Sequence, residues 1–93
     1  MVFSTYNINF KKGTEDWIIV AGEIRNDSAR DYRLAMFRIF VYDKKQVLGN
    51  GVIKIYDFRP HSTRSFETLI ENVSYQLIPA IARHEIVLEE ANF

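Results

Sequence analysis

Apolar and polar side chains alternate with a period of two along most of this sequence, and clusters of turn residues interrupt the alternation. Successive side chains of a β-strand point to opposite faces of the sheet, so such segments predict strands with one buried face. The strands are expected over residues 2–10, 17–26, 32–43, 47–58, 63–70 and 83–90. Residues 71–82 allow two alternatives, a short helical turn or an irregular loop around Pro79.

Six or seven short strands in 93 residues leave no room for the crossover helices of a parallel sheet. The prediction is an all-β fold, an immunoglobulin-like antiparallel two-sheet sandwich of six to seven strands that forms one domain over residues 1–93. A five-stranded closed barrel of the OB type is the alternative architecture.

The alternation also predicts which side chains are buried. In the first strand, Tyr6, Ile8 and Phe10 should share one face. The core should contain six apolar side chains from three later strands, namely Phe37, Ile39, Val41, Ile53, Ile55 and Phe66.

Composition excludes several classes of function. Twelve basic residues balance twelve acidic ones, so no net field attracts nucleic acid or an anionic membrane. The absence of cysteine excludes disulfides, thiolate zinc sites and a cysteine nucleophile. The N-terminus lacks the basic and apolar regions of a signal peptide, and no apolar run is long enough for a membrane helix. We therefore expect a soluble chain without membrane insertion, either intracellular or a module of a longer protein.

Three segments resemble the FxLYD family of small immunoglobulin-like domains. Residues 20–28 (VAGEIRNDS) are similar to the Gly-x-hydrophobic-x-Asn end of a family strand. Residues 39–43 (IFVYD) resemble the motif that names the family, with its Tyr and Asp retained and isoleucine and valine in place of Phe and Leu. Residues 58–66 (FRPHSTRSF) are similar to its Pro-Gly turn and following strand, with His61 at the usual glycine position.

The spacing of these segments agrees with the family over residues 17–70. The resemblance implies an immunoglobulin-like sandwich that serves as an accessory module, without known catalysis. Domains of this family are common in exported bacterial and archaeal proteins. Such proteins usually carry a signal peptide, and none is recognised in this sequence.

No group of residues suggests catalysis, a cofactor or a metal. His61 lies in a predicted turn and His84 near the start of the last strand, outside any zinc-ligand spacing. Glu89 and Glu90 are adjacent, so on a regular strand they would point to opposite faces and not converge. Asp43 is expected to cap the turn that follows the third strand.

The remaining candidate is an interaction surface on the outward faces of the second, third and fourth strands. Aromatic rings and arginine are typical anchors of protein interfaces. The predicted surface consists of Trp17, Arg38, Phe40, Tyr42, Lys54 and Tyr56. This surface favours a non-catalytic protein-interaction or assembly module, which binds through this face or through an edge strand. The partner would be another protein or a second copy of the chain in a homodimer. The alternative is a domain that binds single-stranded nucleic acid or a small ligand on the same rings, although the zero net charge argues against nucleic acid.

Overall fold

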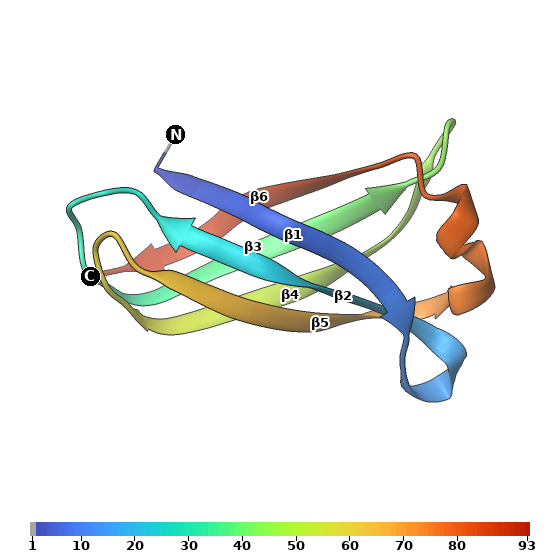
Figure 1. The fold of residues 1–93 in the computed structure, drawn as a ribbon, viewed down its shortest axis with the longest axis horizontal. Coiled ribbons are helices and arrows are strands. Elements are labelled where there is room, and N and C mark those ends of the chain that lie inside the picture. Colours follow the sequence, from blue (N-terminus) through green and yellow to red (C-terminus); the bar gives the residue numbers. More distant parts are fainter. Residues whose placement is uncertain (1) are drawn as a thin grey trace.

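The computed structural model describes residues 2–93, which form six strands in two three-stranded antiparallel sheets (Figure 1). The first sheet has the order β1-β2-β5, with β1 at Phe3–Lys12, β2 at Trp17–Asn26 and β5 at Thr63–Ser74. The predicted all-β two-sheet sandwich is confirmed, because the two sheets are separate layers and do not close into a barrel.

The second sheet has the order β4-β3-β6, so its central strand is β3 (Tyr32–Tyr42). On one side β3 pairs with β4 (Val47–Phe58), to which a tight turn connects it. On the other side it pairs with β6 (Arg83–Asn92), which is distant in the sequence. The sheet therefore combines a local hairpin with a long-range pairing.

Two short 3₁₀ helices connect strands. The helix η1 (Thr14–Asp16) joins β1 to β2, and Gly13 closes this turn by donating its N–H to the carbonyl of Trp17 at 2.7 Å. The helix η2 (Tyr75–Ala80) contains Pro79 and follows β5. The Ser74 hydroxyl oxygen caps η2 by accepting the N–H of Gln76 at 3.1 Å. Of the two alternatives for residues 71–82, the helical turn is therefore correct, although β5 runs four residues further than predicted.

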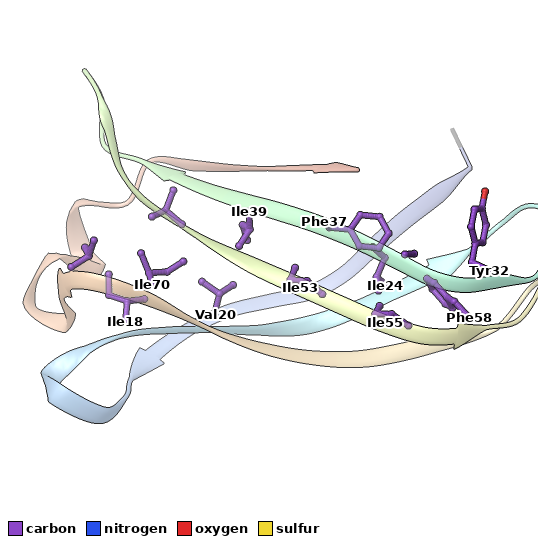
Figure 2. Close-up of a cluster of buried hydrophobic side chains, with 13 residues drawn as sticks. Ile18, Val20, Ile24, Tyr32, Phe37, Ile39, Ile53, Ile55, Phe58 and Ile70 are labelled. Atoms are coloured by element: carbon purple, nitrogen blue, oxygen red, sulfur yellow. The ribbon is translucent and has the colours of Figure 1, made fainter. Parts of the chain in front are cut away.

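The core lies between the sheets and receives side chains from both (Figure 2). Five of the six predicted core residues are buried, and Phe66 is half-buried against the core. Further buried side chains come from β2, β4 and β5, including Ile18, Val20, Ile24, Phe58 and Ile70. The predicted inward faces of β3 and β4 are thus confirmed.

The face prediction fails in β1. The pairing of β1 with β2 shifts between Tyr6 and Asn9, and Asn7 there adopts a left-handed φ of 54°. A bulge inserts an extra residue and so reverses the alternation beyond it. Ile8 and Phe10 pack against the core. Tyr6 pairs with Glu23, points away from the core and is 46% exposed. The prediction that Tyr6 shares their face is wrong.

One long side of the sandwich is closed by contacts between β4 and β5. The Thr68 hydroxyl donates to the carbonyl of Val52 at 2.8 Å, and Arg64 Nη1 donates to the carbonyl of Tyr56 at 2.8 Å. A Cβ on Gly51 would lie only 3.0 Å from the carbonyl oxygen of Leu69, so glycine allows the two strands to approach closely here. These two edges of the sheets therefore cover each other.

The start of β1 and the end of β6 lie at the same end of the molecule (Figure 1). Aromatic rings join the two sheets there. The Phe3 ring packs edge-on against Phe37 with centroids 4.9 Å apart, and it stacks on Phe58 at 5.8 Å. Tyr32 lies 5.3 Å from Phe3 and 5.0 Å from Phe93. Such ring contacts add to the hydrophobic stabilisation of the core.

Candidate interaction surface

The outer face of the second sheet contains five of the six residues predicted to form the surface. Arg38, Phe40 and Tyr42 project from β3 on the side opposite to the buried Phe37, Ile39 and Val41 and are half-buried. Lys54 and Tyr56 project from β4, where they pair with outward residues of β3, and both are exposed. We call this group the outer face; its residues are Arg38, Phe40, Tyr42, Lys54 and Tyr56.

Trp17 does not belong to this group. It is the first residue of β2, in the other sheet, where it pairs with Ser74. The two sheets face each other through the core, so their outer faces point in opposite directions. The prediction that Trp17 shares a surface with Phe40 and Tyr42 is therefore wrong, since β2 and β3 are not neighbours within one sheet.

Arg38 lies at the centre of the outer face and is held from both sides. Its Nε donates to Glu89 Oε2 on β6 at 2.7 Å, and its Nη1 donates to Asn50 Oδ1 on β4 at 2.7 Å. The hydrogen bond to Glu89 raises the pKa of Arg38 above its ordinary value. Arg38 thus links all three strands across this face.

Tyr42 is fixed by two charged residues of β6. Its hydroxyl donates to Glu85 Oε1 at 3.1 Å, and the guanidinium of Arg83 lies 3.7 Å from the centre of its ring. A cation over an aromatic face is attracted by the negative potential of the ring. The ring is therefore held in one position on the sheet.

The strand β6 contributes carboxylates to the outer face that the sequence analysis did not assign to it. The pairing of β3 with β6 shifts between Met36 and Phe37, so that Leu88 pairs with Phe37 and Glu90 with Met36. The bulge brings both Glu89 and Glu90 to the outer side, and the prediction that they point to opposite faces is wrong. No local signal could reveal this, since β3 and β6 are far apart in the sequence.

A hollow of about 490 Å³ lies at the hairpin end of the outer face. Phe40 and Tyr42 form its aromatic wall, while Lys44, Lys45 and Arg83 bring cationic groups to it. The Asp43 carboxylate also lines the hollow, so three cationic groups and one anionic group surround its aromatic wall.

Asp43 caps the hairpin between β3 and β4, as the sequence predicts. Its Oδ1 accepts the backbone N–H groups of Lys45 at 2.7 Å and Gln46 at 2.8 Å. These hydrogen bonds favour the ionised carboxylate and lower the pKa of Asp43 below its ordinary value. Asp43 therefore stabilises the turn that carries the cationic side of the hollow.

The two histidines lie apart from each other. His61 occupies the β4–β5 turn with a left-handed φ of 59°, and its N–H donates to the carbonyl of Asn26 at 2.7 Å. His84 is exposed on β6, and its ring centroid is 6.3 Å from that of Phe10. Within residues 2–93 there is no group of three or more His, Cys, Asp or Glu side chains that could hold a metal ion. The same residues include no helix with the length and apolar character needed to cross a membrane.

Comparisons with protein families, curated proteins and solved structures gave no match to this chain.

Proposed function

We propose that this chain is a non-catalytic protein-interaction module of the immunoglobulin-like, FxLYD type, which binds a protein partner through its outer face. The observation that carries the proposal is the outer face itself, where two aromatic rings and an arginine lie half-buried along the central strand. Tyr56 beside them is 57% exposed. Interfaces concentrate their binding energy in residues of these types.

The strand order supports the immunoglobulin-like part of the proposal. An immunoglobulin-type sandwich places strands A, B and E in one sheet and strand C beside strand F in the other. Here the order β1-β2-β5 corresponds to the first sheet, and β3 beside β6 corresponds to the second.

The β4–β5 turn supports the family resemblance. His61 stands where the family usually has glycine, and its φ of 59° lies in the region that glycine adopts most readily. The asparagine at the end of β2 also has a structural reason. Asn26 is fully buried, and its amide reaches the carbonyls of Phe58 and Arg59 in the β4–β5 turn.

Pre-organisation of the anchors favours binding to a protein. Tyr42 and Arg38 are each held by two neighbours, so little side-chain freedom remains to be lost when a partner binds. The partner that fits best has an apolar centre, an acidic group for the hollow and basic groups opposite the carboxylates of Glu89 and Glu90.

The second candidate function, binding of single-stranded nucleic acid on the same rings, has weaker support. Glu85, Glu89 and Glu90 of β6 border the outer face, and their carboxylates would repel phosphates. Binding that weakens by orders of magnitude between low and moderate salt would favour this candidate over a protein partner.

The test uses two exposed tyrosines on opposite sheets as a matched pair. The immobilised chain is incubated with a lysate of its source organism, and captured proteins are compared between wild type, Tyr56→Ala, Phe40→Glu and Tyr6→Ala. Tyr6 serves as the control, because it is 46% exposed on the side of the first sheet that points away from the core. We expect one captured protein to be lost with Tyr56→Ala and Phe40→Glu and retained with Tyr6→Ala.

Affinity for that captured protein should fall roughly 30-fold or more in Phe40→Glu, the effect of losing an interface anchor of about 2 kcal/mol. Equal capture by Phe40→Glu and wild type, with both proteins folded by circular dichroism, would contradict the proposal.

A further inference from the structure

The sandwich formed by residues 2–93 has four strand edges that lack a partner within their own sheet, and three of them are either covered or protected by a bulge together with lysines. The edges of β4 and β5 cover each other through the hydrogen bonds of Thr68 and Arg64. The edge of β1 is broken by the bulge at Asn7 and carries two exposed lysines at its end. Bulges and lysines are the usual means by which natural proteins prevent edge strands from pairing.

The edge of β6 has less of this protection. It carries one bulge, at Glu89 beyond its central residues, and its ten residues include neither proline nor lysine. Its central residues are apolar, and two of them are well exposed, Val87 at 36% and Leu88 at 44%. A long apolar edge strand presents a row of free N–H and C=O groups to any strand of matching pattern.

The charges along β6 are arranged so that the strand matches a reversed copy of itself. It begins with Arg83, His84 and Glu85, continues with three apolar residues, and carries Glu89 and Glu90 before its last two residues. When two such strands pair in antiparallel orientation, the Arg83 end of one meets the Glu89 end of the other. This complementarity favours a second copy of the chain over an unrelated strand as the occupant of the edge.

We infer that two copies of this chain pair through β6 around a two-fold axis at Ile86, which joins their second sheets into one continuous six-stranded sheet. In this register Arg83 of each copy lies opposite Glu89 of the other, and Glu85 lies opposite Val87. A shift of the axis to Val87 would place Glu85 opposite Glu89, two like charges. The inference rests on the proposed role as an interaction module and names one partner and its contact.

A cleft beside β6 provides apolar area for this contact. It measures about 540 Å³ and lies between the start of β1 and the middle of β6. Phe3, Ile86 and Leu88 form its walls, and the core residues Ile24 and Phe37 lie at its floor. Inward side chains of an added strand point toward the first sheet, so Ile86 and Leu88 of the second copy enter this cleft.

Charge reversal tests both the dimer and its register. Sedimentation equilibrium should show wild type in reversible exchange between the 10.9 kDa monomer and a species of twice that mass. In an Arg83→Glu dimer, the introduced glutamate of each copy faces the native Glu89 of the other. In a Glu89→Lys dimer, the introduced lysine of each copy faces the native Arg83 of the other. Each variant alone should raise the dissociation constant at least about tenfold, because two attractive pairs become repulsive.

An equimolar mixture of the two variants provides the decisive sample. In the mixed dimer, the glutamate introduced into one chain faces the lysine introduced into the other, and the native Arg83 and Glu89 form the second pair. Because both pairs are attractive again, the heterodimer should form at least about tenfold more tightly than either variant pairs with itself. Mixing does not restore the contact between Glu89 and Arg38 within the chain that carries Glu89→Lys. Restoration by mixing cannot result from a folding defect in either variant.

The outcomes separate this inference from the proposed function. Phe40→Glu should abolish capture of the partner protein and leave the β6 dimer intact. A wild-type chain that stays monomeric at millimolar concentration, or a dimer that persists in both single variants, would overturn the inference without affecting the outer-face proposal. A dimer dissolved by Phe40→Glu alone would also overturn it and would assign self-association to the outer face.

Discussion

Asn26 is the one fully buried polar side chain among the described residues, and it connects three segments of the chain. Its amide nitrogen reaches the carbonyls of Arg30 at 2.8 Å, Phe58 at 3.2 Å and Arg59 at 3.2 Å. Its Oδ1 accepts the N–H and the hydroxyl of Ser28. A buried polar group is tolerated when its hydrogen bonds are satisfied, as they are here.

Replacement of Asn26 by alanine should lower the free energy of unfolding by about 3 kcal/mol, because one buried and two part-buried carbonyl groups lose their donor. Asn26→Asp should be at least as harmful at neutral pH, since its carboxylate would face the same carbonyl oxygens. It should regain part of its stability in acid, where the protonated carboxyl group is a donor. Urea unfolding at two pH values measures both effects, and a neutral-pH stability of Asn26→Asp equal to wild type would contradict this role.

His61 adopts a left-handed φ of 59°, which costs a residue with a Cβ roughly 1–2 kcal/mol. Glycine avoids that cost but loses more backbone entropy on folding. His61→Gly should therefore raise the free energy of unfolding by up to about 1 kcal/mol, with the hydrogen bond to the Asn26 carbonyl retained. Thermal unfolding measures the change, and the control is Ser65→Gly in the adjacent extended strand, which should destabilise. A loss of stability in His61→Gly would show that the histidine side chain itself stabilises the turn.

At the scale of elements, one face of β3 packs into the core and the other lies on the surface. Its inward residues Phe37, Ile39 and Val41 fill the core, and its outward residues Arg38 and Phe40 belong to the outer face. Period-two alternation was sufficient to predict this division because β3 has no bulge between Phe37 and Val41. Where a bulge occurs, at Asn7 and beside Glu89, the same rule assigned the wrong face.

The sequence also could not predict which strands are neighbours. Trp17 and Phe40 are both aromatic residues at outward positions of their strands. However, β2 pairs with β1 and β5, whereas β3 pairs with β4 and β6. Pairing between distant strands depends on the packing of the whole sandwich, not on local composition. The number and order of the strands were therefore predictable, the ends of β1, β5 and β6 less so, and the composition of the outer face only in part.

The two faces of β3 should respond differently to truncation. Phe37→Ala should lower the free energy of unfolding by roughly 3–5 kcal/mol, because it leaves a cavity among buried side chains. Phe40→Ala should cost less than half as much, because this ring is half-buried on the outer face. Denaturant unfolding of both variants measures the contrast, and equal costs would contradict the assignment of faces.

The β3–β4 hairpin should contribute a pH-dependent part of the stability through Asp43. Its folded pKa is lowered, mainly by the N–H groups of Lys45 and Gln46, relative to an unfolded value of about 3.9. A group with a lowered folded pKa stabilises the fold above its unfolded pKa, and this contribution disappears as the pH falls through the folded pKa. Asp43→Asn keeps an acceptor oxygen but does not titrate, so its unfolding should depend less on pH below about 4. Identical acid unfolding curves of variant and wild type would contradict this account.

At the scale of the whole molecule, the sandwich is asymmetric: the β4–β5 side is closed, and the side between β1 and β6 contains the cleft. The central strands β2 and β3 each have a neighbour on both sides, while β6 has one. Local opening requires the least free energy where few neighbours hold a strand and its apolar residues are exposed. The free edge of β6 is therefore both the proposed surface for pairing and the part expected to open most easily.

Native-state hydrogen exchange should reveal this asymmetry. In dilute solution, where the chain is monomeric, amides of β6 should exchange through openings at least about 2 kcal/mol below global unfolding, while amides of β2 and β3 should exchange only on global unfolding. The β5 amides provide the control, since β5 is also an edge strand but its open side is covered by β4. At high protein concentration the β6 amides should gain protection and the β5 amides should not, because in the proposed dimer a second copy occupies only the β6 edge. Exchange of β6 as slow as that of β3 in the monomer would show that the cleft side is as firmly held as the closed side.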